Sequence, residues 1–445
     1  MNIKEYIRKL IKTCNEHKIT DVEVYYSSSS STVINVVNDE VENFKLSNNE
    51  GINISGNYEG KNSVTYIEKF DDDSMILAVN NIKETAPYNN KVRKTVEKNN
   101  LDNKSDASDN ADIDHKTDIN HVIEKLKTIS KKAKIFSEKI IAVPRCEYYE
   151  NRTKIILFDD RGAELEDFYS YSLGSIGLVA QEGEIKKNAY SSRIGKCFEE
   201  VDYNSILKDA ADEAISMINA KPIKSGNYDV IIKNSTAANI FASFMPVFYA
   251  DAIKKNTSKL KGKTDTQVAV NNLNIIEDPL YPKAKIKRNF DDEGIKTYKK
   301  PLIENGTLRN ILSSSEYENS TGNAYRDSYR SNIAVSALNC YIEPGVKQTS
   351  EMILGLKEGV MITNVDGLHA GINTTTGDFS LIANGYYIEN KEIKKPVNQI
   401  TVAGNFYEML NNIIDISEDV LTSDNYINYF ESPSLLVKGL MIGGL

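Results

Sequence analysis

The feature that most constrains the fold of this 445-residue chain is a polar stretch over residues 88–118. It consists mainly of Asn, Asp, Lys and Ser and holds almost no large apolar side chain. Such a composition cannot bury enough apolar surface to fold alone, so we predict a flexible linker. The linker separates an N-terminal unit over residues 1–87 from a central unit over residues 119–221.

The first unit is predicted to be a helix, several strands and a second helix. Apolar residues at helical spacing from Ile3 to Ile11 precede a run of strand-like segments, and helical spacing returns over residues 71–83. Apolar and polar residues alternate, as in strands, over residues 21–26, 32–37, 41–47, 51–58 and 63–67.

The central unit repeats that order, with a predicted helix near residues 120–137 and a closing helix over residues 202–218. Residues 154–161 form a strand that ends in a polar turn, and they match residues 33–40 in role. We therefore interpret the two units as a diverged internal duplication. The strands predicted in the central unit are residues 146–150, 153–158, 163–169 and 172–181.

A third domain is predicted over residues 225–445, after a hinge that contains Pro222 and Gly226. We expect a helix over residues 235–249, followed by many short strands separated by turn signals. The predicted fold class is α+β. It comprises two similar units of helices and antiparallel sheet, followed by a large, mainly antiparallel β domain with few helices.

Charge and cysteine content exclude several classes of protein. Lys and Arg total 54 against 63 Asp and Glu, a net charge of −9, so direct binding to nucleic acid is not expected. The four cysteines form no C-x-x-C pair, which is typical of reduced thiols in a cytoplasmic protein. Residues 1–17 alternate charged and apolar side chains, so we expect neither a signal peptide nor a membrane anchor there.

The sequence holds few candidates for hydrolytic chemistry. Its four histidines, His17, His115, His121 and His369, form no H-E-x-x-H or H-E-x-x-x-H pattern, and no G-x-S-x-G element occurs. His369 lies in a Gly-flanked loop, where it is either a base or substrate contact or a loop side chain that bonds to backbone. Cys340 lies in a strand-like apolar run, where a thiol is usually inert.

Nine segments of the C-terminal domain, taken in order, form a distinctive set. They are Phe290–Gly294, Leu302–Gly306, Ser320–Ala324, Gly367–Gly371, Thr376–Ser380, Ile388–Asn390, Pro396–Val397, Ile400–Asn405 and Ser432–Leu436. Together they resemble the TldD/PmbA family, whose members were once named as modulators of DNA gyrase. The resemblance extends to the N-terminal helix and to residues 21–26, so it covers nearly the whole chain apart from the polar linker.

The resemblance implies a zinc metallopeptidase of two subunits that degrades small or unfolded peptides and matures certain modified peptides. In that system TldD carries an H-E-x-x-x-H helix, and TldE/PmbA carries none.

This chain departs from the zinc-binding pattern of the family. Aligned with TldD, it has Phe241, Ala242 and Pro246 where that subunit has His, Glu and His. Phe and Ala cannot ligate zinc or activate a water molecule, and Pro has no ring nitrogen to donate. The resemblance therefore implies that this chain binds no zinc and that the zinc belongs to a TldD-like partner. Phe241 and Phe244 lie instead in an apolar stripe that faces either the core or a partner.

We predict that this chain is the noncatalytic TldE/PmbA-like subunit of a heterodimer, completing a peptide-holding cavity around the zinc site of a TldD-like partner. One alternative is a peptide- or protein-binding homodimer that acts as a scaffold or regulator. Another is an independent metallopeptidase with unrecognised ligands. No direct contact with nucleic acid or with a membrane is expected. The candidate residues for the cavity or the interface are Phe241, Phe244, Thr321, Gly322, Asn323, Arg326, His369, Gly377, Asp378, Phe379 and Ser380.

Overall fold

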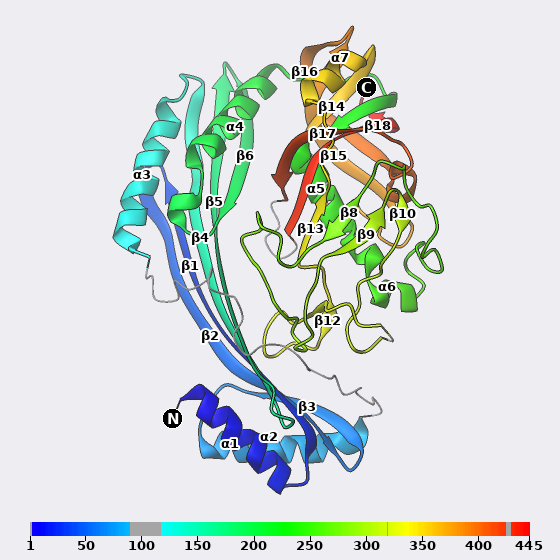
Figure 1. Cartoon of the computed structure of the whole chain (residues 1–445). Helices are drawn as coiled ribbons and strands as arrows, with labels where there is room; N and C mark the ends of the chain where they lie inside the picture. Colours follow the sequence, from blue (N-terminus) through cyan, green and yellow to red (C-terminus); the bar gives the residue numbers. More distant parts are fainter. Residues whose placement is uncertain (1, 90–116, 318, 424–428) are drawn as a thin grey trace.

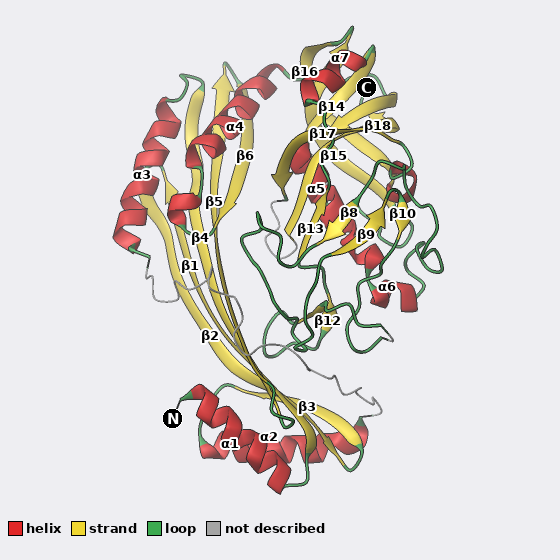
Figure 2. Cartoon of the chain, viewed as in Figure 1, coloured by secondary structure: helices red, strands yellow, loops and turns green. Residues whose placement is uncertain are grey.

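The computed structural model describes residues 2–89, 117–317, 319–423 and 429–445. Most of the predicted linker, including His115, lies outside the described residues. The described residues form one long six-stranded sheet with four helices, and a β-rich C-terminal domain packs against that sheet (Figure 1, Figure 2). The prediction of an α+β fold is confirmed.

Both N-terminal units contribute to the same antiparallel sheet. The strand order is β3-β2-β1-β4-β5-β6, so β1 and β4 pair in the middle and each unit supplies three consecutive strands. Helix, three strands and helix follow one another in both units. The strands are β1 (Thr20–Val37), β2 (Glu40–Tyr58), β3 (Lys61–Ile67), β4 (Ile140–Asp159), β5 (Glu164–Glu182) and β6 (Ile185–Gly195).

The four helices cover one face of this sheet, in two pairs at opposite ends (Figure 1). Helices α1 (Ile3–Glu16) and α2 (Asp72–Thr85) pack on one end, and α3 (Ile119–Ile135) and α4 (Tyr203–Ser216) pack on the other. Helix α1 begins where the Asn2 side chain accepts a hydrogen bond from Lys4 N at 3.0 Å, because a capping side chain satisfies an unpaired N–H of the first turn. Each end therefore has its own hydrophobic core.

The strands are longer than the sequence pattern predicts. The serine run within β1 and the polar residues opposite it in β2 and β4 are continuous strand, so the strand breaks predicted there are wrong. Hydrogen-bonded neighbours on both sides hold this part of β1 extended although its side chains are polar: Ser29, for example, lies between Asn49 and Thr153. The same correction joins the segments predicted separately at residues 163–169 and 172–181 into β5.

The C-terminal domain is built on a second, ten-stranded sheet. Strand β18 pairs with both β16 and β7, so β18, β16, β15, β14 and β7 close into a ring. Most pairs are antiparallel, as predicted, but β14 with β7 and β13 with β18 are parallel. The bounds are β7 (Gly226–Ile232), β8 (Ile275–Glu277), β9 (Lys300–Glu304), β10 (Thr307–Leu308), β13 (Asn339–Ile342), β14 (Glu358–Asp366), β15 (Asp378–Glu389), β16 (Glu392–Asn405), β17 (Ile413–Thr422) and β18 (Tyr429–Gly443), with β11 (Ala324–Tyr325) and β12 (Ala334–Val335) as a separate pair.

The helix predicted over residues 235–249 is shorter than expected. Helix α5 (Asn234–Phe244) ends before Pro246, and a 3-10 turn, η5 (Met245–Phe248), follows it. Proline has no N–H to continue the helical ladder, which accounts for the change. The remaining short helices of this domain are α6 (Ala250–Lys254), α7 (Thr349–Gly355) and α8 (Phe406–Met409). No helix in the described part of the chain is long and apolar enough to cross a membrane.

The C-terminal domain packs on the face of the long sheet that the helices leave open. Side chains alternate between the two faces of a strand. Accordingly Tyr26 joins the core under α1, while its neighbour Tyr25 contacts the C-terminal domain. An apolar cluster in the contact between sheet and domain contains Tyr25, Ile155, Leu157, Leu165, Phe290 and Tyr329, which are all buried.

Candidate functional site

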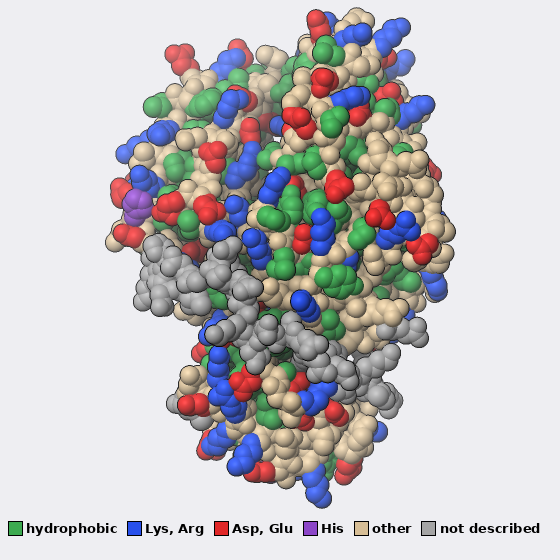
Figure 3. Space-filling view, viewed as in Figure 1, with side chains coloured by type: hydrophobic (Ala, Val, Ile, Leu, Met, Phe, Trp, Pro, Cys, Tyr) green, Lys and Arg blue, Asp and Glu red, His purple; other side chains and the backbone are tan. Residues whose placement is uncertain are grey.

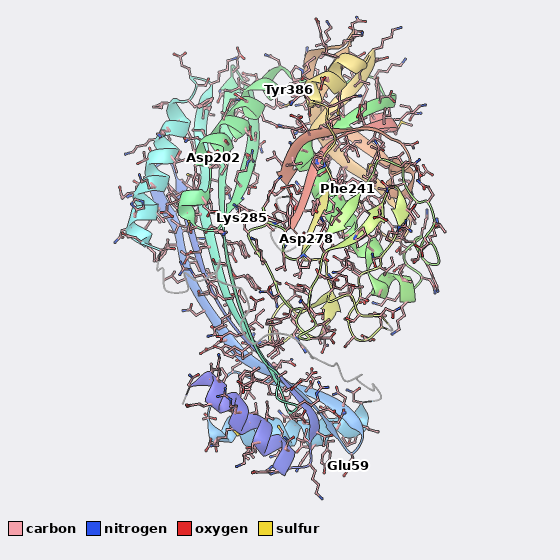
Figure 4. The ribbon with its side chains drawn as sticks, viewed as in Figure 1. Glu59, Asp202, Phe241, Asp278, Lys285 and Tyr386 are labelled. Carbon is pink, nitrogen blue, oxygen red and sulfur yellow. The ribbon has the colours of Figure 1, made fainter. Side chains whose placement is uncertain are left out.

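Helix α5 carries Phe241 and Phe244, which belong to a packed aromatic cluster. Phe241 is 2% exposed, and its ring centroid lies 5.3 Å from that of Phe406 and 5.7 Å from that of Phe430. Figure 4 shows Phe241 inside the C-terminal domain. Phe244 is fully buried and stacks on Phe406 with a centroid distance of 4.3 Å. Of the two alternatives that the sequence leaves open, the core and a partner surface, the structure has both side chains in the core.

The donor chemistry at the three aligned positions does not fit zinc. Ala242 is buried among apolar side chains, and Pro246 lies exposed in the η5 turn. None of Phe241, Ala242 and Pro246 has a nitrogen, oxygen or sulfur atom in its side chain that could ligate a metal ion. Across the described residues, no group of three or more His, Cys, Asp and Glu side chains is arranged to hold a metal ion.

The loop of Thr321, Gly322 and Asn323 is part of a buried polar network. Asn323 is 1% exposed and donates from Nδ2 to Glu277 Oε1 at 2.9 Å. The ammonium of Lys300 lies 2.6 Å from Glu277 Oε2, and both side chains are buried. Gly322 has φ +72°, and a Cβ there would lie 2.9 Å from Lys296 O. The side chains of Thr321 and Asn323 are therefore buried in the interior, while Arg326, at the end of the predicted loop, borders a cavity described below.

The acidic motif from Phe290 to Gly294 anchors the same loop. Asp291 accepts a hydrogen bond from Ala324 N at 2.9 Å, and Asp292 accepts one from Arg326 N at 2.7 Å. Burial, and then the nearby charge of Glu293, raises the pKa of Asp291 to about 7. The motif therefore contributes to loop structure, and its carboxyl groups are buried.

An open cavity lies between the middle of the long sheet and the C-terminal domain. Its volume is about 420 Å³, within the range of small-ligand sites. We call it the tyrosine cleft, because seven tyrosines line it: Tyr25, Tyr149, Tyr169, Tyr171, Tyr325, Tyr329 and Tyr429. Of the predicted residues, only Arg326 borders the tyrosine cleft.

The floor of the tyrosine cleft is polar and uncharged. It is formed by Ser27 and Ser29 of β1 and by Asn151 and Thr153 of β4, which lie on the face of the sheet toward the C-terminal domain. Sequence reasoning missed these residues because a serine run between apolar segments is typical of a turn. Their position in the middle of long strands is set by pairing with β2, β4 and β5, which the local sequence pattern does not show.

The charged side chains around the tyrosine cleft include several close pairs. Arg288 is buried and lies 2.8 Å from Asp167 of β5 and 2.9 Å from Asp292. Arg330 pairs with Glu68, and the guanidinium of Arg326 lies 5.2 Å from the centroid of the Tyr25 ring. On the face shown in Figure 3, acidic and basic side chains are interspersed. The charged residues that line the tyrosine cleft are Arg288, Arg326, Asp327 and Arg330, and both Arg288 and Arg330 have acidic partners.

The predicted loop of Gly377, Asp378, Phe379 and Ser380 borders a surface depression of about 550 Å³. Gly377 itself has φ +83° and packs against Tyr407. A hydrogen bond from the Asn405 amide, and then one from Thr376, lowers the pKa of Asp378. Phe379 is a core residue, at 3% exposed, and His369 is exposed in the preceding loop. This loop does not reach the tyrosine cleft, so the structure does not bring the two predicted loops into one site within the described chain.

Comparison with known proteins adds the following likenesses. Residues 225–444 match the family model described as the PmbA/TldA metallopeptidase C-terminal domain. The zinc metalloprotease TldD homolog of Saccharolobus solfataricus is 27% identical over 347 residues, which cover 74% of this chain and 75% of that protein.

Two crystal structures resemble the chain over almost its full length. A protein from Thermotoga maritima, described as a candidate modulator of a DNA gyrase, is 25% identical with a TM-score of 0.84, over 99% of this chain and 100% of that one. TldE from Thermococcus kodakarensis is 19% identical with a TM-score of 0.86, over 99% and 100% of the two chains. The second likeness shows the fold alone.

Proposed function

Because the chain belongs to the TldD/PmbA family, we propose that it is the subunit without a zinc site in a two-component metallopeptidase, in which a TldD-like partner holds the zinc. The observation that carries this proposal is the packing of Phe241 at the first position of the zinc motif. That side chain is 2% exposed between two further phenylalanines. A position occupied in this way contributes hydrophobic stability and offers no ligand.

In this proposal the chain acts on peptides only together with its partner. The partner supplies the zinc and the water that zinc activates, while this chain contributes a surface that holds the peptide. The tyrosine cleft supports that role, because it is an open cavity of peptide-binding size within a chain that lacks zinc ligands at the family position.

The test is to purify this chain and the TldD-like protein of the same host, separately and after co-expression. Zinc content and cleavage of an unfolded peptide are measured for each sample. Activity that requires both proteins, with zinc only in the partner, is the expected result. If this chain alone holds stoichiometric zinc and cleaves peptides in a chelator-sensitive way, it is an independent metallopeptidase and the proposal fails.

A second candidate function is that of a peptide-binding homodimer without a protease role. The tyrosine cleft could hold a peptide in this candidate too, without a partner that carries zinc. Light scattering after size exclusion separates the two candidates. A stable homodimer that binds peptide and does not associate with a TldD-like protein supports the second.

A further inference from the structure

The floor of the tyrosine cleft has a composition that the hydrophobic cores do not explain. The two cores under the helices lie at the ends of the sheet, and Ser27, Ser29, Asn151 and Thr153 lie between them. A long strand that served only to connect the two ends could carry any β-forming side chains here. Small hydroxyl and amide side chains instead keep this face open and polar.

Side chains of the floor form a short chain of hydrogen bonds that leads from Thr153 through Asn151 to Ser29. Thr153 Oγ1 donates to Asn151 Oδ1 at 2.8 Å, and Asn151 Nδ2 donates to Ser29 Oγ at 3.1 Å. A serine hydroxyl has one hydrogen to donate, and here its oxygen is already an acceptor. Thr153 Oγ1 also lies 3.4 Å from Ser29 Oγ, which is a long contact. Because Ser29 accepts from Asn151, its own hydrogen can be given to an acceptor above the floor.

The main chain of the floor cannot recognise a ligand. Along this stretch β1 is paired on one side with β2 and on the other with β4, and β4 is paired with β1 and β5. Their N–H and C=O groups are used within the sheet, so a peptide cannot add there as a further strand. Recognition must use side chains.

The aromatic walls add flat apolar surfaces to these polar groups. The rings of Tyr149 and Tyr171 have centroids 5.9 Å apart, and both side chains line the tyrosine cleft. Aromatic grooves of this kind bind extended peptides through ring contacts with proline, glycine or aromatic residues. The cation of Arg288 is matched by Asp167 and Asp292, and that of Arg330 by Glu68. The other two charged lining residues, Arg326 and Asp327, have opposite charges, so the lining does not select a ligand of either sign.

From these observations we propose that the tyrosine cleft binds an extended, uncharged peptide segment. The tyrosine rings contact its side chains, and Ser29 donates to one of its carbonyl oxygens. This inference rests on the proposed function in that it names the class of peptide the chain holds. It is tested on this chain alone, without zinc or partner.

The absence of tryptophan from the chain provides the assay. The probe is a blocked peptide of Gly, Ser, Pro and Tyr with one Trp, whose fluorescence anisotropy rises when it binds the protein. Two matched probes carry Glu or Lys at the Ser positions. The uncharged probe is expected to bind at least about tenfold more tightly than either charged probe.

Neighbouring serines on opposite faces of β1 provide matched variants. Ser29→Tyr places a ring in the tyrosine cleft, and Ser30→Tyr places the same ring on the exposed opposite face. Ser29→Tyr is expected to weaken binding at least about tenfold, and Ser30→Tyr to leave it within about twofold. Should Ser29→Tyr fail to fold, Ser29→Ala, which removes only the donor, is expected to weaken binding about fivefold.

Three outcomes overturn the proposal: no binding of the uncharged probe by the wild-type chain, equal binding of the charged probes, or equal effects of the two Tyr variants. None of these outcomes depends on peptide cleavage, so the two proposals can fail separately. The two-component proposal fails if cleavage does not require the partner, even when the tyrosine cleft binds the probe. The cleft proposal fails if the probe does not bind, even when cleavage requires both proteins.

Discussion

Replacing Arg288 by Met is expected to be among the most destabilising single changes in this protein. The guanidinium is 4% exposed and lies within 2.9 Å of both Asp167 and Asp292, which are 0% and 1% exposed. Removing one partner of a buried ion pair typically costs about 3–5 kcal/mol, because the other charge stays buried without compensation. Two carboxylates lose their partner here, so we expect a value of about 5 kcal/mol.

The assay is thermal unfolding followed by circular dichroism. For a domain the size of the C-terminal one, about 2–4 °C is lost per kcal/mol, so the midpoint is expected to fall by about 10 °C or more. Asp167 belongs to the long sheet and Arg288 to the C-terminal domain, so the variant should weaken the contact between these two parts. A protease should then cleave the chain between the sheet and the C-terminal domain faster than in the wild type.

Acidification should partly rescue this variant. Burial raises the pKa of Asp167 in the wild type, and Arg288 opposes that effect. Without Arg288 the pKa rises further, so the folded protein binds a proton more readily than the unfolded chain. The variant then loses stability as pH rises. The difference in unfolding free energy between wild type and variant should be larger at pH 7 than at pH 5.

The matched control is Arg309→Met. Arg309 is 39% exposed and pairs with Asp265 and Glu304 at the surface. Such exposed pairs contribute about 1 kcal/mol or less. If Arg288→Met lowers the unfolding midpoint no more than Arg309→Met does, the argument from buried charge is refuted.

Two further predictions concern the C-terminal domain. Phe244→Ala removes a fully buried ring that stacks on Phe406. The free energy of unfolding, measured in urea, should fall by about 3–5 kcal/mol. A fall of less than about 1 kcal/mol would mean that the aromatic cluster does not belong to the hydrophobic core. Burial raises the pKa of Asp291 in the folded protein above its value in the unfolded chain, so the contribution of this group to stability falls as pH rises through that range. The change in unfolding free energy from pH 4 to pH 7 should therefore be more positive in Asp291→Asn than in the wild type, and an identical change in both would contradict the assignment.

The aromatic cluster around α5 is predicted in part by the sequence and in part only by the tertiary structure. Helical spacing of apolar residues predicts that Phe241 and Phe244 share a face, and this holds in the structure. The pattern cannot say whether that face meets the core or a partner. Phe406 and Phe430, which cover it, lie more than 160 positions away in the sequence.

The loop at Thr321 to Arg326 is a second case in which the sequence pattern does not predict burial. A glycine flanked by polar residues is typical of an exposed loop, and on that basis the loop was expected to line a cavity. Buried polar groups need hydrogen-bond partners, and here Glu277, Lys300 and Asp291 supply them. Because these partners lie up to 46 positions from Asn323 along the chain, the sequence pattern does not show that Thr321 and Asn323 are buried while Arg326 borders the tyrosine cleft.

The sequence alone determined the α+β class and the repeated order of elements on either side of the polar stretch. These features depend on residue identity and on spacing over a few turns or strands. Only the tertiary structure decided that both N-terminal units share one sheet and that the serine run of β1 becomes the floor of the tyrosine cleft. The physical reason is that strand pairing and cavities join residues more than a hundred positions apart, such as Ser29, Asn151 and Tyr325, whose contacts leave no periodic trace in the sequence.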